Sequence, residues 1–206
     1  MKKDIKDIFV LFLITVVAGC LLGFVNNITK EPIKRQHEEA KNKAYKAVMP
    51  DADRFEEMDA DYKLMLEGSD YYETCSVDSV IKAYKNDELL GYLITITDNE
   101  GYGGDITLVS AIKSDGTING ISILTINETA GLGMNAKKPE FYEQFAGRKV
   151  DKFVYTKSGA TKDSEIDAIS SATITTNAVT NAVNASIVAY DYIKIVSLPD
   201  VNGGAN

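Results

Sequence analysis

The sequence has very few of the residues that build metal centres and hydrolytic active sites. It contains two cysteines, Cys20 and Cys75, and one histidine, His37. Cys20 lies in an apolar run, and no C-x-x-C or Cys/His spacing is present, so we expect no iron–sulfur cluster and no structural zinc site. His37 follows charged residues on a probable helix, which is typical of a solvated surface residue rather than of a catalytic triad. We therefore expect no metal site and no catalytic residue.

Clusters of basic residues are also missing. The formal net charge is −8, and no run of Lys or Arg offsets it. Because the phosphates of nucleic acids repel an acidic surface, we expect no nucleic-acid partner. The 206 residues, of which 45% are hydrophobic, suit one globular domain of moderate size and an appendage.

The longest uncharged run covers residues 8–25 (IFVLFLITVVAGCLLGFV). As a helix it would span roughly 27 Å, close to the ~30 Å hydrocarbon core of a bilayer, which predicts a single transmembrane helix. Two alternatives are a lipoprotein signal, because residues 17–20 (VAGC) resemble a lipobox, and a cleaved secretory peptide. The apolar run continues past Cys20, which favours the anchor.

The domain organisation follows from these patterns. We predict a short tail and transmembrane helix over 1–27, a helical stalk over 28–50, the main domain over 51–198 and a flexible tail over 199–206. The helix of the stalk is expected over 31–48, with Pro32 in its first turn, since proline suits that position.

The main domain is expected to be of the α+β class. Apolar runs predict four antiparallel strands, over 80–84, 89–97, 105–112 and 117–126. The turns at 85–88 (KNDE) and 113–116 (KSDG) would join them in pairs, and Asp-Gly is a strong hairpin signal. A short helix over 139–146 and a long helix over 172–193 would pack on the sheet. No element is predicted in residues 51–72.

Two near-copies of one small-residue pattern precede the long helix. Residues 158–161 read SGAT (the first copy) and residues 170–173 read SSAT (the second copy). The second copy opens the long helix, so its hydroxyls suit an N-cap. The N–H groups and dipole of a helix start also favour a phosphate, for which Thr175 and Thr176 would be further donors. Residues 101–104 (GYGG) permit close approach to the backbone or form a flexible loop.

These segments resemble a known family. Residues 167–173 (DAISSAT) are similar to the flavinylation motif Asp-x-x-Ser/Thr-Gly-Ala-Thr of the FMN-binding domain family, and residues 128–133 (ETAGLG) are similar to its Glu-Thr-Pro-Gly-Leu-Gly loop. Nearly the whole chain resembles the G subunit of the Rnf electron-transport complex, with the NqrC subunit of the sodium-pumping NADH:quinone reductase as a close relative.

This chain departs from the motif at two positions. Ser171 and Ala130 replace the family's glycine and proline, and a serine would be strained if position 171 needs a positive φ. The first copy keeps the glycine but has Tyr155 in place of the aspartate. We therefore favour Thr173 over Thr161 as the flavin carrier.

The resemblance implies FMN attached covalently through its phosphate to Thr173. The residues implied to surround it are Ser170, Ser171, Ala172, Thr175, Thr176, Glu128, Thr129, Gly131, Leu132, Tyr102, Gly103 and Asp167. Asp167 would serve recognition by a separate flavin transferase, which is an implied partner.

The implied function is that of a membrane-anchored electron-carrier subunit, not catalytic alone, in an ion-translocating ferredoxin:NAD oxidoreductase. Its partners would be the other membrane subunits of that complex. The alternatives are the NqrC subunit of a sodium-translocating NADH:quinone reductase and a non-redox extracytoplasmic binding module. The resemblance places the main domain on the extracytoplasmic face of a bacterial cell membrane, although the lysines on either side of residues 8–25 favour the opposite orientation.

Overall fold

The computed structural model describes the backbone of residues 2–196, and it describes side chains from Lys6 onward except that of His37. The expectations for the His37 side chain and for the tail over 199–206 therefore lie outside the described residues. The chain divides into two compact units, Met1–Asn42 and Lys43–Asn206, with the division before the predicted boundary at residue 51.

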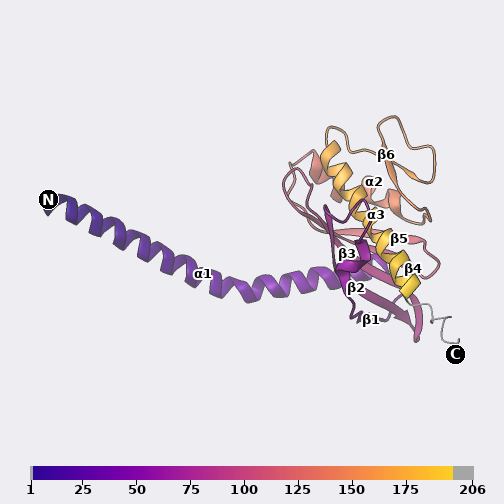
Figure 1. Cartoon of the computed structure of the whole chain (residues 1–206), viewed down its shortest axis with the longest axis horizontal. Helices are drawn as coiled ribbons and strands as arrows, with labels where there is room; N and C mark the ends of the chain where they lie inside the picture. The colour runs from indigo at the N-terminus through magenta and orange to yellow at the C-terminus, as the bar shows by residue number, and fades with distance from the viewer. Residues whose placement is uncertain (1, 197–206) are drawn as a thin grey trace, which may run out of the picture. The chain divides into compact units, whose positions relative to one another are not determined.

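Helix α1 (Lys2–Val48) is continuous through the predicted anchor and stalk (Figure 1). Pro32 lies inside it, so the expected helix start at that proline is wrong. Proline removes one intrahelical hydrogen bond, and the Lys, Glu and Ala residues that follow are good helix formers that continue the helix. Residues 8–25 are all exposed. The most apolar 18-residue window of α1 has a mean hydropathy of 2.9, so the helix is long and apolar enough to cross a membrane.

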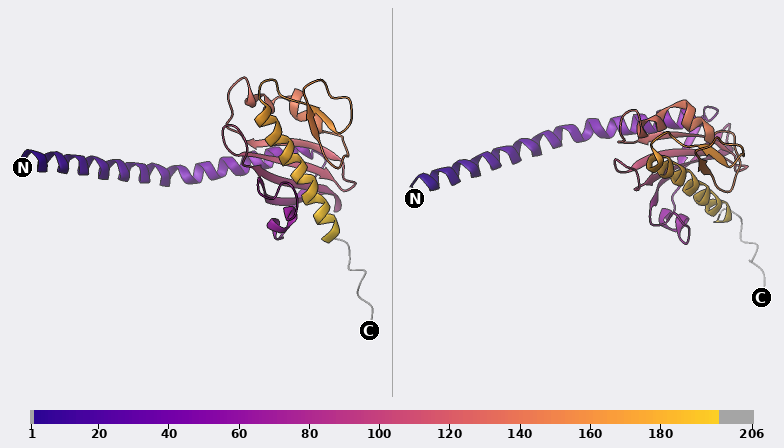
Figure 2. Two further views of the ribbon diagram at one scale, coloured as in Figure 1. Left: turned by 45° about the horizontal axis from the view of Figure 1, so that its top comes forward. Right: turned by 90° about the horizontal axis from the view of Figure 1, so that it is seen from above.

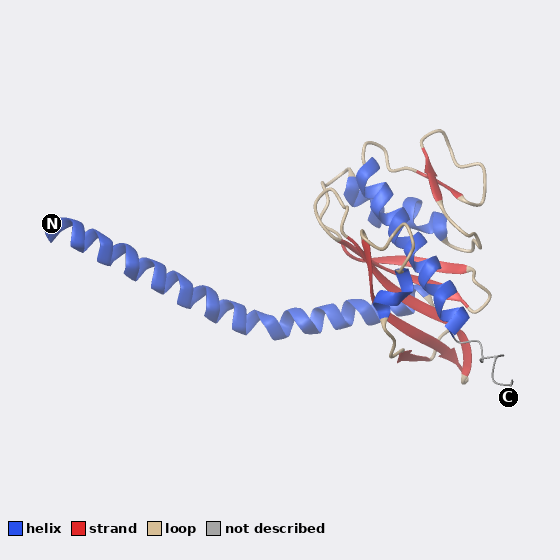
Figure 3. Cartoon of the chain, in the orientation of Figure 1, coloured by secondary structure: helices blue, strands red, loops and turns tan. Residues whose placement is uncertain are grey.

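A five-stranded antiparallel sheet forms the centre of the second unit (Figure 3). Its strands, in chain order and in spatial order, are β1 (Arg54–Glu57), β2 (Cys75–Lys85), β3 (Glu88–Asp98), β4 (Ile106–Lys113) and β5 (Ile118–Thr125). The predicted hairpins are confirmed. Asn86 and Asp87 have φ of 49° and 65°, as a two-residue hairpin turn requires, and Gly116 has φ of 91° in the second turn.

Both faces of the sheet are covered. Helix α3 (Thr173–Val196) crosses one face diagonally, over β3 and β4 (Figure 2). Its fully buried Ala178, Ala182, Ala185 and Ala189 allow close approach to the strands. On the other face, Tyr45 and Val48 at the end of α1, and Met49 directly after it, pack on Ile81, Leu93 and Val109. The end of the predicted stalk is thus part of the hydrophobic core on this face of the sheet.

Several short elements were not predicted. They are the 3₁₀ helix η1 (Tyr62–Leu66), strand β1, the 3₁₀ helix η2 (Gly133–Lys137), and the parallel pair β6 (Val154–Thr156) and β7 (Glu165–Asp167). The helix expected over 139–146 is one turn of α-helix, α2 (Pro139–Tyr142), followed by the 3₁₀ helix η3 (Glu143–Phe145). Elements of three to five residues have too few positions to show a period of 2 or 3.6 residues.

Candidate functional site

A pocket of about 540 Å³ lies at the N-terminus of α3. The residues that line it are Tyr102, Glu128, Thr129, Leu132, Gly133, Ser171, Ala172, Thr173, Ile174 and Thr175. We call it the motif pocket. It brings together three segments that the sequence analysis singled out, namely the GYGG loop, the ETAGLG loop and the second copy of the small-residue pattern. Ser170, Asp167, Thr176, Gly103 and Gly131 do not line it.

Among residues 2–196, no side chain accepts a hydrogen bond from the first N–H groups of α3. The N–H of Thr176 donates to the carbonyl oxygen of Ala172 at 2.9 Å, which makes Ala172 the N-cap residue. Alanine has no side-chain acceptor, and the side-chain hydrogen bonds of the described residues at this turn come from Thr176 and not from Ser170 or Ser171. The helix therefore retains its capacity to bind an anion at this end. The simple interpretation of the second copy as a capped helix start is not supported.

Ser171 and Thr176 shape the turn before α3. Ser171 has φ of 59°, the left-handed conformation that the family's glycine would adopt without strain. The fully buried hydroxyl of Thr176 accepts from the N–H of Ile169 at 3.0 Å and donates to the carbonyl of Ala172 at 2.9 Å. Thr176 thus supports the turn that presents Ser171 and Ala172 to the pocket, and its own hydroxyl is engaged inside the protein.

Glycines let the walls of the motif pocket approach one another closely. A Cβ at Gly103 would lie 1.8 Å from the carbonyl oxygen of Asn127, and the N–H of Gly103 donates to Glu128 at 3.3 Å. A Cβ at Gly133 would lie 2.5 Å from the Thr175 hydroxyl and 2.7 Å from a carboxylate oxygen of Glu128. We expected the GYGG loop to permit close approach of a ligand. At Gly103 the close neighbour is instead the main chain of Asn127.

The ETAGLG loop forms a tight turn. The carbonyl of Thr129 accepts from the N–H groups of Leu132 and Met134 at 3.1 and 3.2 Å. Gly131 has φ of 77°, and its carbonyl accepts from the Asn135 side chain at 2.9 Å. Gly131 therefore acts in the turn and leaves the pocket wall to Thr129 and Leu132.

The motif pocket is lined by three large, exposed side chains and by no cation. Tyr102, Leu132 and Ile174 are 70%, 40% and 51% exposed, an unusual concentration of large apolar side chains beside one opening. No Lys or Arg is among the lining residues, and Glu128 is the one carboxylate. A bound anion would depend on the helix N-terminus and on hydroxyl groups.

Asp167 and Ser170 lie on a second, smaller pocket of about 320 Å³. The residues that line it are Asn135, Lys138, Glu140, Phe141, Gln144, Asp167, Ala168, Ile169 and Ser170, and we call it the side pocket. The flavinylation-like motif therefore divides at the Ser170–Ser171 bond, with its first half on the side pocket and its second half on the motif pocket.

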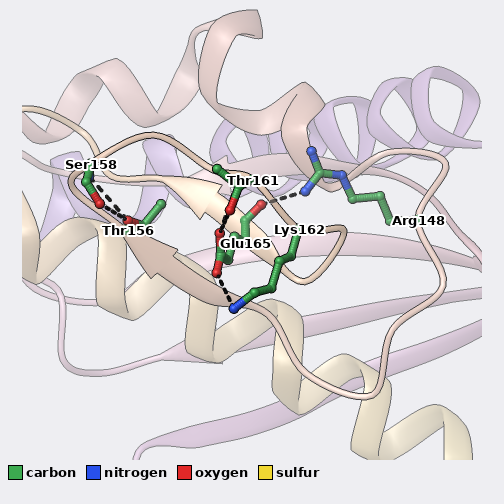
Figure 4. A network of polar contacts seen from close by, with 6 residues as sticks. All are labelled: Arg148, Thr156, Ser158, Thr161, Lys162 and Glu165. Atoms are coloured by element: carbon green, nitrogen blue, oxygen red, sulfur yellow. Dashed lines mark hydrogen bonds and ion pairs between the residues drawn. The ribbon is translucent and has the colours of Figure 1, made fainter.

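The first copy of the pattern is engaged in a polar network of its own (Figure 4). The N–H and hydroxyl of Thr161 both donate to Glu165 at 3.0 Å, and the ammonium of Lys162 lies 3.1 Å from the other oxygen of that carboxylate. The Thr161 N–H, Lys162 and the Thr161 hydroxyl, in that order, lower the pKa of Glu165 to about 2. The Thr161 hydroxyl thus already has a strong acceptor, in a loop that does not line the motif pocket.

Some features of the site were not predicted. Gly133, the last residue of the ETAGLG loop, and Ile174 were not predicted as site residues. Both line the motif pocket. A larger hollow of about 590 Å³, between the end of α1 and β5, contains none of the predicted site residues.

Comparisons with known proteins agree with the motif. The FMN-binding domain family matches residues 101–188. The chain is 33% identical to the G subunit of the Na⁺-translocating ferredoxin:NAD⁺ oxidoreductase complex of Acetobacterium woodii, covering 94% of this chain and 97% of that protein. It is 30% identical to the G subunit of the proton-translocating ferredoxin:NAD⁺ oxidoreductase complex of Clostridium ljungdahlii, covering 91% and 95%. NqrC of Shewanella oneidensis has a similar fold, with a TM-score of 0.57 at 16% identity, over 79% of this chain and 99% of that one.

Proposed function

The chain belongs to the family of the G subunits of ion-translocating ferredoxin:NAD⁺ oxidoreductase (Rnf) complexes, and from this we propose that it is an electron-carrier subunit with FMN esterified to Thr173. The observation that carries the proposal is the position of Thr173, at the uncapped start of α3 and on the wall of the motif pocket. Two relatives at 30% identity or more, matched over more than nine tenths of this chain, are both G subunits of ferredoxin:NAD⁺ oxidoreductase complexes, which favours the Rnf complex over the quinone reductase.

The residues of the motif pocket suit FMN. A volume of about 540 Å³ falls in the range of roughly 300–1,000 Å³ that ligand pockets span. The helix start and the Thr175 hydroxyl can donate to a phosphate, while Tyr102, Leu132 and Ile174 offer apolar surface for a flat ring. When bound, the flavin supplies one- and two-electron redox chemistry, and the protein supplies its position and surroundings.

The absence of a cation at the pocket favours an ester over a free phosphate. A phosphomonoester carries about −1.5 to −2 charges at pH 7. Esterification to a threonine leaves a diester with about one negative charge. The partial charge of roughly +0.5 at a helix N-terminus balances a larger share of this charge than of the charge on a monoester. No Lys or Arg lines the motif pocket to supply the remainder.

Attachment would need a partner enzyme, because an unactivated threonine hydroxyl is a weak nucleophile. We propose a flavin transferase that uses FAD. The Thr173 oxygen bonds to the flavin-side phosphorus, the phosphoanhydride bond breaks, AMP leaves, and the hydroxyl proton passes to the transferase. No oxidation or reduction occurs in this step.

The proposed setting is a membrane complex. The exposed apolar residues 8–25 of α1 would anchor the chain, with the second unit on the extracytoplasmic face. Its partners would be the other subunits of the complex, and the exposed rim of the motif pocket would leave the flavin accessible to them. The two relatives are named for different coupling ions, Na⁺ and protons.

Flavin fluorescence in denaturing gels tests the attachment. The full chain would be produced in a host with an active transferase, alongside Thr173→Ala and Thr161→Ala. We expect Thr173→Ala to lose all in-gel fluorescence and Thr161→Ala to retain it. Mass spectrometry of the tryptic peptide 163–194 should show the added mass of FMN less one water.

Thr161→Ala is the matched control, because it makes the same substitution in the first copy. Fluorescence retained by Thr173→Ala and lost from Thr161→Ala would transfer the site to the first copy. An unlabelled wild-type chain, in a host that labels a second acceptor protein, would refute covalent attachment.

A further inference from the structure

The first copy, residues 158–161, has no role in the proposed function, yet the fold places it beside the flavinylation-like motif. Strands β6 and β7 run parallel, and Thr156 pairs with Asp167, so the two copies leave the same edge of adjacent strands. The main-chain N–H of Ala160 donates to one carboxylate oxygen of Asp167 at 2.7 Å. The first copy therefore holds the aspartate that begins the motif of the second.

Gln144 holds the main chain of the same aspartate. Its side-chain oxygen accepts from the N–H of Asp167 at 2.6 Å, and its side-chain nitrogen lies 3.3 Å from the Asp167 carbonyl oxygen. That nitrogen also donates to the carbonyl of Glu140 at 3.2 Å, which ties the arrangement to α2. The main chain and carboxylate of Asp167 are thus fixed from two separate elements.

The loop that carries Ala160 is itself well supported (Figure 4). Arg148 donates to the carbonyl oxygens of Asp163 and Glu165 at 3.1 and 2.6 Å. Gly159 has φ of 95°, a conformation that side chains rarely adopt, and this turn directs the Ala160 N–H at Asp167. Such support indicates a fixed position rather than a lid.

Asp167 nevertheless remains available to a partner. The residue is exposed, and within the part of the chain that the structure describes its second carboxylate oxygen has no hydrogen-bond partner. It opens on the side pocket, together with Lys138 and Ser170. A partner that contacts Asp167 there would leave the motif pocket, on the other side of the Ser170–Ser171 bond, free for the flavin nucleotide.

We propose that Gln144 and the Ala160 N–H are positioning groups for flavin attachment, because they hold Asp167 in one orientation for the transferase to read at the side pocket. This inference rests on the proposed function. Gln144 and Ala160 act through Asp167 and do not line the motif pocket that contains Thr173, so they affect how tightly the acceptor chain is recognised rather than the transfer step.

Steady-state transfer kinetics test this role. The full chain, purified in detergent from a host without the transferase, would be the varied substrate of purified transferase with FAD and Mg²⁺. The variants are Gln144→Met, which removes both bonds to Asp167, and Ala160→Pro, which removes the N–H donor. We expect each to raise KM for the acceptor chain by roughly tenfold, the size expected for one or two lost hydrogen bonds, with kcat within about twofold of wild type.

Gln144→Glu is the conservative variant. It keeps the acceptor for the shorter bond, at 2.6 Å, and should recover part of the KM. The same substitutions in an Asp167→Ala background provide a double-mutant cycle. If Gln144 acts through Asp167, Gln144→Met should have no further effect on KM there.

The outcomes separate this inference from the proposed function. A wild-type chain that accepts no flavin refutes covalent attachment. The positioning role alone is refuted if the wild type is labelled and Gln144→Met leaves KM unchanged. It is also refuted if Gln144→Met raises KM by the same factor with Asp167 and in the Asp167→Ala background. Thermal unfolding followed by circular dichroism checks that each variant is folded. Should Ala160→Pro not fold, Gln144→Met and Gln144→Glu decide the question.

Discussion

Ser171 is the residue at which this chain departs most clearly from the motif, and its backbone shows the consequence. At φ of 59° it occupies the left-handed region, where an L-residue with a Cβ is disfavoured by roughly 1–2 kcal/mol. Within residues 2–196, the side-chain hydrogen bonds at this turn are those of Thr176, and the Ser171 hydroxyl makes none that would offset this cost. The turn is retained because the buried Thr176 hydroxyl fixes both of its ends.

We expect Ser171→Gly to stabilise the protein by about 0.5–1 kcal/mol. Relief of the strain outweighs the larger conformational entropy of glycine in the unfolded chain, which costs about 0.5–1 kcal/mol. Urea unfolding of the full chain in detergent, followed by near-ultraviolet circular dichroism, measures the difference. Ser170→Gly is the matched control, because Ser170 is not at positive φ and should show only the entropic loss. Equal effects at both positions would contradict the strain argument.

At the scale of elements, Asn184 links α3 to the segment that leads into β6. Its buried side chain accepts from the N–H of Phe153 at 2.8 Å and donates to the carbonyl of Phe153 at 3.0 Å. Phe153 in turn packs edge-on against Phe145, with ring centroids 5.1 Å apart. The amide of Asn184 therefore replaces the strand partner that Phe153 lacks.

Asn184→Ala is expected to destabilise the protein by about 2–4 kcal/mol. The substitution leaves a buried N–H and a buried carbonyl without partners, at a cost of roughly 1–3 kcal/mol each, reduced where water enters the space. Urea unfolding measures the effect. Asn181→Ala, on the same helix at a partly exposed position, is the control and should be neutral or slightly stabilising, since alanine has the higher helix propensity. A loss at Asn184 no larger than the change at Asn181 would contradict the role of the two hydrogen bonds to Phe153.

The elements that the sequence predicted well are those with a local signal. The two hairpin turns contain Asn, Asp and Gly, the residues that accept the positive φ these turns require. Helix α3 has apolar and small residues at helical spacing, so a short stretch of sequence was sufficient to predict each of these elements. The pairing of β6 with β7 depends on contacts with η3 and α3 that are distant in sequence, and no pattern of three residues could indicate it.

Predictions for the site divide in the same way. The flavinylation-like motif located the start of α3. Eight of the residues that the family resemblance implied line the motif pocket at this helix start: Tyr102, Glu128, Thr129, Leu132, Ser171, Ala172, Thr173 and Thr175. The sequence could not show that Thr176 points inward, or that Asp167 lies on a separate pocket, because both depend on how the turn at residues 169–172 is folded. Whether these residues hold FMN stays a prediction.

At the scale of the whole molecule, the sheet has two faces, and different parts of the chain cover them. Helix α3 covers one, while Tyr45, Val48 and Met49, at 7%, 5% and 3% exposure, cover the other. The side chain of Asn119 also donates to the carbonyl of Val48 at 2.6 Å, which fixes the end of α1 on the strand β5. Residues after the division at Asn42 therefore belong to the folded unit, even though they read as stalk.

Truncation distinguishes the two boundaries. A chain that begins at residue 43 retains Tyr45, Val48 and Met49 on their face of the sheet and should fold as a water-soluble protein. A chain that begins at residue 51 loses Tyr45, Val48 and Met49, whose burial stabilises by roughly 1.5–3 kcal/mol each, so we expect it to be destabilised by several kcal/mol and prone to aggregation. Urea unfolding and light scattering of the two truncated chains measure this. Equal stability of the two chains would mean that Tyr45, Val48 and Met49 are not needed to cover the face of the sheet that carries Leu93 and Val109. The folded unit would then begin at residue 51, as predicted from the sequence.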